Sequence, residues 1–537
     1  MKCRLILPSL CSLALAISLA PAFGATVIWD GGGADNGWST GNNWDSNTVP
    51  TTATPFDDVQ FAGSVRTAVN VDTDVTVKTL KFNSGASAFD LSGTGTITVN
   101  GQGTGSGDSG LDFRNESSAL QTINNKIILG SPGVGFRAVN GDLTFNGEID
   151  MTAATNIRFL GAGSRVTTFN GELSGTGGGT MAFNSGGIFV LNAVNSYAKN
   201  TSIWTATVKV NVDAPSGANG AFGNATSSIS MGTTYDGGHL TSTMLTTNAV
   251  TIGRSITLAS THVNRAGDPH IYTIGGETAQ VSNYTGTIFN SNNSGTKAAS
   301  KLTVTAASGG RVNIANIVRG TGAVGDADDV VKTGAGIVAI TGVNNDWQGN
   351  TLVQSGAFLV NGSVLTSPSG KNVQVSAGAT LGGMGTLSRD VELASTAVLS
   401  PGDMDASGNS LGGTLTLGDG IGLSLSAGTL LNFDLAAAGS LLDDEISIIG
   451  DLVLAGLLNV NDLGGFSTGE YKLFGWTGSL TYTPGDLTFG DMPSGYDYAI
   501  DTTTYANSAY LVVTPEPSRM ILLLAGLSVI CFGRRRK

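Results

Sequence analysis

A six-residue segment of this chain recurs further along it, and this repeat limits the folds that the chain can adopt. Residues 144–149 (TFNGEI) return as residues 168–173 (TFNGEL), and residues 122–127 (TINNKI) form a fainter copy upstream of the first. Elsewhere Thr, Val, Ile and Leu alternate in short runs that Gly, Asn, Asp and Ser separate, a pattern that favours short strands joined by turns. Strand units that repeat every 20-odd positions are typical of solenoids, so the sequence predicts an all-β fold built as a β-solenoid.

The composition excludes several other classes of chain. Glycine accounts for 78 of the 537 residues but shows no three-residue period, which excludes collagen. With 40% hydrophobic and 12% charged residues, the chain does not have the composition of a charge-rich disordered protein. Six of the 27 basic residues lie at the two ends of the chain, which leaves 21 against 40 acidic residues and a net charge of −19 for the body. Such a body repels phosphate groups, so we expect no nucleic-acid partner and no binding to anionic lipid.

The N-terminal segment, 1–25, has the layout of a secretory signal peptide. Lys2 and Arg4 form a basic start, residues 5–19 are apolar, and residues 20–25 supply the small side chains that a signal peptidase needs. We expect cleavage after residue 24 or 25. The chain is therefore predicted to be exported.

The three cysteines lie in the terminal segments, at Cys3, Cys11 and Cys531. The exported body therefore has no disulfide and must be held by backbone pairing and a long core. Leu10 stands before Cys11, where a lipoprotein signal needs a small residue, so lipidation at the N-terminus is not expected.

The C-terminus combines a proline motif, a short apolar run and a basic end. The motif is Pro515, Glu516 and Pro517, and the apolar run covers residues 520–532. About 13 residues make a helix of about 20 Å, whereas a stable membrane span needs about 20 residues. The basic stop that follows, and that would stay on the cytoplasmic face, consists of Arg534, Arg535, Arg536 and Lys537.

This layout resembles the PEP-CTERM sorting signal. The resemblance implies processing by an exosortase-type membrane enzyme, transient insertion of the C-terminal helix in the inner membrane, and a final place at the cell surface or in the extracellular matrix. It also implies that the protein functions in association with exopolysaccharide in the envelope or biofilm of Gram-negative bacteria. An ordinary tail anchor is the alternative.

A second motif occupies residues 332–362. Turn, strand, turn, strand, turn and strand follow one another, with Asn345, Trp347 and Thr351 in the central part. A looser copy at residues 187–201 has an Asn, an aromatic residue and a Thr at the same spacing. We expect the Asn to bond its neighbours and the aromatic ring to pack on an adjacent coil.

These residues resemble the autotransporter-associated β-strand repeat, which implies a right-handed parallel β-helix. Further coils are expected downstream, with the strand rhythm continuing to residue 514. The segments predicted to contribute them are residues 376–383 and 399–403, with residues 414–418 and 423–428 as two more separate coils.

The predicted organisation has five parts. They are the signal peptide (1–25), an N-terminal β cap region (26–99), a β-solenoid (100–330), the autotransporter-associated repeat region (331–513) and the sorting signal (514–537).

Three tryptophans gather in the N-terminal region, at Trp29, Trp38 and Trp44. Bulky side chains at this position can cover the open end of a β-stack, which needs protection against edge pairing. Alternatively, aromatic faces bind sugar rings, so the three are also candidate glycan contacts.

We predict no catalytic residue, no cofactor and no metal. β-Helix enzymes that degrade polysaccharides pair carboxylates on one face, and strand alternation allows only Asp326 with Asp328, or Asp443 with Glu445, to do so. Turns explain these residues equally well. The three histidines lack zinc spacing, and residues 403–408 lack the acidic residue that closes a calcium loop.

The sequence thus predicts a non-enzymatic structural or surface protein. A polysaccharide-degrading enzyme and a carbohydrate-binding adhesin are the alternatives.

Overall fold

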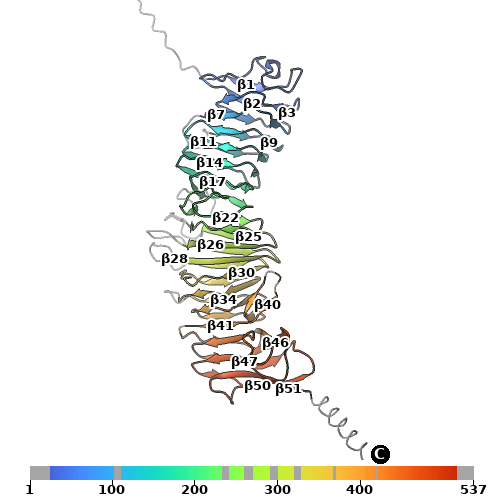
Figure 1. The fold of residues 1–537 in the computed structure, drawn as a ribbon, viewed down its shortest axis with the longest axis vertical. Helices are drawn as coiled ribbons and strands as arrows, with labels where there is room; N and C mark the ends of the chain where they lie inside the picture. Colours follow the sequence, from blue (N-terminus) through green and yellow to red (C-terminus); the bar gives the residue numbers. More distant parts are fainter. Residues whose placement is uncertain are drawn as a thin grey trace, which may run out of the picture.

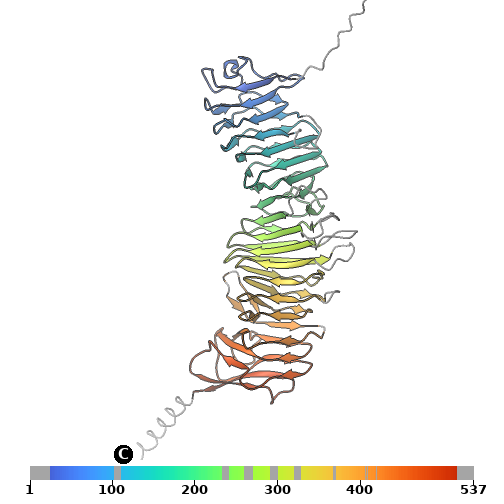
Figure 2. The same cartoon turned by 180° about the vertical axis from the view of Figure 1, so that it is seen from behind.

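The structure is a computed structural model, and it describes residues 24–101, 111–232, 241–258, 270–290, 300–319, 328–366, 371–405, 407, 409–418 and 420–516. The predicted signal peptide up to residue 23, Cys531, Pro517, the apolar run and the four basic residues at the C-terminus lie outside these ranges. The described chain winds into a long, gently curved rod with β1 (Thr26–Trp29) at one end and β51 (Ser508–Pro515) at the other (Figure 1). Figure 2 shows from behind that the strands run across the rod axis along its whole length.

Successive coils of the rod pair in parallel, so that each face is a sheet whose hydrogen bonds run along the axis. The longest sheet, which we call the long sheet, extends from β1 to β49 and has 20 strands in the described residues. In chain order they are β1, β2 (Asp58–Phe61), β5 (Thr79–Phe82), β8 (Leu111–Asn115), β11 (Gly133–Ala138), β14 (Asn156–Leu160), β17 (Thr180–Asn184), β19 (Asn200–Ile203), β21 (Ile229–Met231), β23 (Thr251–Ile252), β24 (Ile256–Leu258), β26 (Val281–Asn290), β28 (Arg311–Arg319), β30 (Ile337–Ile340), β32 (Ala357–Val360), β35 (Thr380–Gly383), β38 (Val398–Pro401), β43 (Leu430–Leu435), β46 (Gly456–Asp462) and β49 (Leu487–Phe489).

A second sheet of 14 strands, the middle sheet, covers another face from the first coils to residue 393. It contains β3 (Ala68–Asn70), β6 (Asp90–Ser92), β9 (Gln121–Ile123), β12 (Leu143–Phe145), β15 (Val166–Phe169), β18 (Ile188–Leu191), β20 (Thr207–Val210), β22 (Thr241–Thr246), β25 (His270–Gly276), β27 (Ser300–Ala306), β29 (Asp329–Thr333), β31 (Thr351–Val353), β34 (Val373–Val375) and β37 (Val391–Leu393).

Three smaller sheets complete the faces. A third N-terminal face has β4 (Val75–Val77), β7 (Ile97–Val99), β10 (Ile127–Leu129), β13 (Ile149–Asp150) and β16 (Leu173–Ser174). The C-terminal half has one sheet of β33 (Ser363–Val364), β36 (Thr386–Leu387), β41 (Thr414–Leu417), β44 (Glu445–Ile448), β47 (Gly469–Trp476), β50 (Tyr496–Asp501) and β51, and one of β42 (Leu423–Ser424), β45 (Leu452–Val453) and β48 (Leu480–Thr481). Outside the sheets of the coils lie the hairpin β39 (Asp403–Met404) and β40 (Ser410–Leu411) and the 3₁₀ turn η1 (Gly41–Asn43).

The repeat found in the sequence is the repeat of the coils. Thr144 pairs with Thr168 and Phe145 with Phe169, while Thr122 pairs with Thr144 on the other side. The asparagines that follow these strands form an exposed ladder in which each side-chain amide donates to the one before it. The bonds are Asn146 to Asn124 at 2.7 Å, Asn170 to Asn146 at 2.8 Å and Asn192 to Asn170 at 2.7 Å. The predicted all-β solenoid is confirmed, and the periodicity arises from side chains that stack in register.

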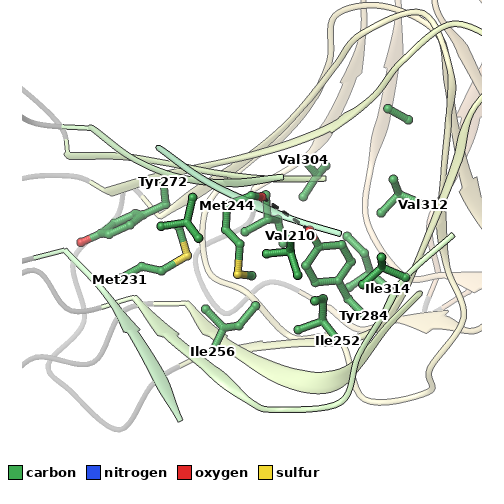
Figure 3. Packing of buried hydrophobic residues seen from close by; sticks show 14 of the residues in the cluster. Val210, Met231, Met244, Ile252, Ile256, Tyr272, Tyr284, Val304, Val312 and Ile314 are labelled. Carbon is green, nitrogen blue, oxygen red and sulfur yellow. Dashed lines mark hydrogen bonds between the residues drawn. The ribbon is translucent and has the colours of Figure 1, made fainter. Parts of the chain in front are cut away.

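The core fills the inside of the coils with columns of apolar side chains. Along the long sheet, Phe113, Phe136, Phe159 and Phe183 occupy equivalent positions, with ring centroids 5.5, 5.0 and 5.6 Å apart. Figure 3 shows a later part of the same core, where Met231, Met244 and Tyr284 point inward between the faces. Column stacking lets each coil bury its apolar face against the next, which a single coil could not do alone.

The motif at residues 332–362 builds a corner of the coil. The buried Asn345 accepts a hydrogen bond from Ile317 N of the preceding coil at 2.7 Å and donates to Ser363 O of the next at 3.0 Å. The indole of Trp347 is also buried, and its Nε1 donates to Thr351 Oγ1 at 3.2 Å.

The looser copy at residues 187–201 builds the same corner. Asn195 accepts from Leu173 N at 2.8 Å and donates to Ala221 O at 2.7 Å, and the Tyr197 hydroxyl bonds Thr201 Oγ1 at 3.0 Å. The expectation that the Asn bonds its neighbours is therefore confirmed in both copies.

Two details downstream differ from the expectation. Residues 414–418 and 423–428 were expected to form two separate coils, but β41 and β42 are successive strands of one coil, on two of its faces. Because β41 ends at Leu417 and β42 begins at Leu423, the chain between them can change face but cannot complete a circuit. Residues 399–403 form a coil strand only as far as Pro401, because Asp403 begins the antiparallel hairpin β39–β40.

The C-terminal end of the rod is closed by antiparallel strands. β51 pairs antiparallel with both β47 and β50, in contrast to the parallel pairing of the coils. The reversal ends the stack, since no further coil can follow in the same direction.

Candidate functional site

The three N-terminal tryptophans lie in the core of the first coils. Trp29, Trp38 and Trp44 each have 0% exposure, and Trp44 makes edge contacts with the other two at 5.1 and 4.8 Å. All three also contact Phe61 on β2. This arrangement fits the interpretation as a cap, and it leaves no ring face open to a sugar.

The candidate carboxylate pairs have separate structural partners. Asp326 lies outside the described residues, Asp328 is buried, and Asp329 accepts a hydrogen bond from Asn350 N at 2.8 Å. Asp443 accepts from Ala436 N and Ser440 N in a turn, whereas Glu445 forms an ion pair with Lys472 at 2.7 Å. Neither set presents two facing carboxylates to solvent in the part of the chain that the structure describes.

Part of the sorting motif is visible at the C-terminal end. Pro515 is exposed and is the last residue of β51, and Glu516 follows it directly. Among the residues that the structure describes, none belongs to a helix long and apolar enough to cross a membrane. Figure 1 places this end of the chain at the tip of the rod, beside β50.

A polar groove lies on the outer face of the long sheet. It has a volume of about 730 Å³ and crosses β38, β43 and β46, with Met404 and Asn409 of the hairpin β39–β40 on one side. The polar side chains that line it come from successive coils and from the loops beside them. They are Ser400, Asn409, Asn432, Asp434, Asn459, Asn461, Asp462 and Asp491.

Two side-chain ladders form the floor of the groove. Asn459 Nδ2 donates to Asn432 Oδ1 at 2.9 Å, and Asn461 Nδ2 donates to Asp434 Oδ1 at 2.7 Å. Both bonds join adjacent strands of the long sheet, because Asn432 pairs with Asn459 and Asp434 with Asn461 in the parallel register. The ladders fix the spacing of the outward polar groups at that of the strands.

A buried carboxyl adjoins the groove residue Asp434. Asp444 is fully buried, and its two oxygens accept hydrogen bonds from Gly413 N at 2.8 Å and from Asp434 N at 2.9 Å. Burial, together with the neighbouring carboxylate of Asp434, raises the pKa of Asp444 to about 9. Asp444 is therefore protonated at neutral pH, and Asp434 is the member of the pair that lines the groove.

The hairpin that borders the groove is tied to a distant coil. Arg311 on β28 donates to the two carboxylate oxygens of Asp403 at 2.9 and 3.2 Å and also to Met404 O. Met404 packs on a small apolar cluster on the outer face of β30 and β32 that includes Ile337 and Leu359. The hairpin therefore lies against these coils (Figure 1), as a wall that the fold holds in place.

The described residues show no metal cluster. No group of three or more His, Cys, Asp or Glu side chains in the part of the chain that the structure describes could hold an ion. His270, the one described histidine, is buried, contacts Ser242 Oγ at 3.2 Å and stacks on Tyr272. Burial lowers the pKa of His270 to about 4, so it is neutral at pH 7.

The groove was not predicted from the sequence, although a signal was present. Residues 430–434 (LLNFD) return as residues 457–461 (LLNVN), and their polar members are the groove ladders. In this repeat the Leu–Leu pair marks the strand, and the residues at the third and fifth positions face outward. The role of the hairpin left no such signal, because Arg311 and Asp403 are 92 residues apart.

Comparison with known proteins gives one partial likeness. No protein-family model matches the chain. Over 160 residues the chain is 32% identical to the adhesin BmaC autotransporter of Brucella suis biovar 1 (strain 1330). The match covers 29% of this chain and 4% of the adhesin, so the chain spans a small fraction of that protein. The likeness is thus distant and partial.

Proposed function

We propose that this protein is exported and works as a non-enzymatic structural or surface protein, with its rod held at the cell surface or in the extracellular matrix. The observation that carries the proposal is the unbroken long sheet from β1 to β49, with a buried aromatic cluster at one end and antiparallel strands at the other. Such a body spaces its two ends apart and offers a long lateral surface. The partial likeness to an autotransporter adhesin supports a place at the cell surface.

Delivery in this proposal depends on the two terminal segments. The signal peptide at residues 1–25 starts export, and the PEP-CTERM sorting signal of Pro515, Glu516, Pro517 and the basic stop Arg534–Lys537 inserts briefly in the inner membrane for an exosortase-type enzyme. The exposure of Pro515 at the end of the terminal strand supports this assignment, because a processing enzyme can reach the motif without unfolding a coil. Exopolysaccharide is the proposed neighbour of the delivered rod.

The absence of catalysis is part of the proposal. The buried Asp444 uses both carboxyl oxygens on backbone N–H groups, Asp443 accepts hydrogen bonds in a turn, and Glu445 forms an ion pair. A glycosidase needs two carboxyl groups that are separated by about 5 to 10 Å across an open substrate site. The described residues favour binding over bond cleavage.

The experiment that tests delivery is mass spectrometry of the mature C-terminus in the cells that make the protein. We expect the exported protein to end before Arg534, and the double substitution P515A/P517A to leave the full tail in place. The control P493A changes a proline in the same terminal region outside the motif and should be processed normally. An intact Arg534–Lys537 tail on the exported wild-type protein would refute the sorting signal.

A further inference from the structure

We propose that the groove on the long sheet is a binding site for an uncharged oligosaccharide. The inference deepens the proposed function and rests on it, since an exported rod meets extracellular polysaccharide along its side. It does not involve the tryptophans, which are buried at the other end of the rod.

The free hydrogen-bonding groups of the groove suit hydroxyl groups. Asn432 accepts from Asn459, and among the described residues no acceptor is bonded to its Nδ2, so both of its amide hydrogens are left for a ligand. Asp491 is exposed, and its carboxylate has no bonded donor in the described chain. A sugar hydroxyl donates one hydrogen bond and accepts others, so it can bond to an amide and a carboxylate at once.

The charge of the groove selects against anionic ligands. Its ionisable lining consists of Asp434, Asp462 and Asp491, with no Lys or Arg among the lining residues that the structure describes. The nearest cation of the wall, Arg311, is occupied by Asp403. A uronate or sulfated chain would therefore be repelled, whereas a neutral chain would not.

Two other ligand classes fit the geometry less well. A metal ion lacks a cluster of three suitable side chains in the described residues. A peptide that binds by strand addition needs an unpaired sheet edge, but β43 pairs with β46 along its whole length. On the other side its first two residues pair with β38, and the backbone N–H and C=O of Asp434 bond Asp444. The groove lies on the face of the sheet, where side chains alone make contact.

The direction of the groove matches a chain of sugars. It crosses three successive strands, whose spacing of about 4.8 Å is close to the length of one pyranose unit in an extended chain. Met404 and Leu463, both partly exposed, supply apolar surface for the C–H faces of the rings. A volume of about 730 Å³ falls in the range of small-molecule sites and allows a short oligosaccharide rather than a single sugar.

The test is calorimetric titration of the full-length chain with four hexasaccharide probes. Cellohexaose, maltohexaose and mannohexaose are neutral, and oligogalacturonate is anionic. We expect at least one neutral probe to bind with Kd on the order of 0.1 mM, and the anionic probe to bind at least tenfold more weakly. The inference would be overturned if none of the three neutral probes bound, or if oligogalacturonate bound as tightly as the best neutral probe.

Variants locate the binding in the groove. N432A/N461A should lower the affinity for the neutral probe at least tenfold. D491A removes a side chain that has no internal bond in the described chain, and it should lower this affinity several-fold. N170A is the matched control, because Asn170 belongs to the exposed ladder in the N-terminal half of the rod, far along the chain from the groove. Unchanged affinity in both groove variants, with unchanged thermal unfolding, would refute the site.

The outcome separates this inference from the proposed function. A correctly processed surface protein that binds no neutral probe would overturn only the glycan site. Shortened products in the titration cell would support the groove as the site while contradicting the proposal that the protein is not an enzyme. Binding by a protein whose C-terminal tail is never processed would contradict the sorting signal alone.

Discussion

Some ionisable side chains inside the rod, Lys332 and Asp444 among them, are held by backbone groups rather than by opposite charges. Lys332 is buried and donates to Thr333 O, Gly334 O and Ser355 O, at 2.8 to 2.9 Å. Burial lowers the pKa of Lys332 to about 8. The carbonyl groups at these turns would otherwise lack hydrogen-bond donors. The buried side chain therefore satisfies backbone groups that the coil itself leaves without partners.

Asp444 gives the unfolding free energy a dependence on pH. Its pKa is raised from 3.8 to about 9 by burial, so the unfolded chain loses the proton at a lower pH than the folded one. The stability from the neutral carboxyl is complete below pH 3.8 and is lost as the pH rises toward 9. We expect D444N, whose amide does not titrate, to flatten the fall of the unfolding free energy between pH 6.5 and pH 8, measured by urea unfolding.

The choice of pH window limits the contribution of two other groups to this measurement. His270, with its pKa lowered from 6.5 to about 4, contributes stability that is present above pH 6.5 and lost as the pH falls. Lys332, with its pKa lowered from 10.5 to about 8, adds stability mainly as the pH rises beyond 8. N170A, which changes no ionisable group, should keep the wild-type slope. Equal slopes for D444N and the wild type would show that Asp444 is ionised in the folded state.

At the scale of the element, the corner asparagine matters more than the ladder asparagine. N345A removes bonds to Ile317 N, Gly342 O and Ser363 O, and it leaves these backbone groups without partners. We expect a loss of about 2 to 4 kcal/mol in unfolding free energy, from chemical denaturation. N170A, in an exposed ladder whose groups can turn to water, should cost less than about 1 kcal/mol. Similar costs for both would contradict the role of the corner in joining three coils.

The same comparison explains what could be predicted from the sequence. The corner was found because Asn345, Trp347 and Thr351 act within one turn of the chain, and the coil repeat because Phe145 and Phe169 stack in register. The groove depends on which face a strand presents and on a hairpin held by Arg311 from 92 residues away. Long-range placement of that kind leaves no local pattern, and the protonation of Asp444 depends on burial that only the folded chain creates.

At the scale of the whole molecule, the rod has a length that can be measured. The long sheet has 20 strands, of which β23 and β24 share one level because both pair with β26. At about 4.8 Å per level the stack is about 90 Å long. We expect small-angle X-ray scattering to give a maximum dimension of about 100 Å for the monomer. A value of about 60 Å, that of a compact chain of this size, would contradict the rod.

The direction of the backbone hydrogen bonds decides how the molecule responds to tension. Because the strands lie across the rod, the bonds between coils point along it, so a pull on the two ends loads the coils in series (Figure 2). One coil contains only about 23 residues. Gly135 N on β11 donates a hydrogen bond to the carboxylate of Asp112, which lies on the preceding coil and 23 residues earlier in the chain. A coil that gives way would lengthen from about 4.8 Å to about 75 Å of extended chain, while its neighbours stayed folded. A rod built in this way is stiff under small loads and yields one coil at a time under large ones, as a tether that absorbs shear would need to do.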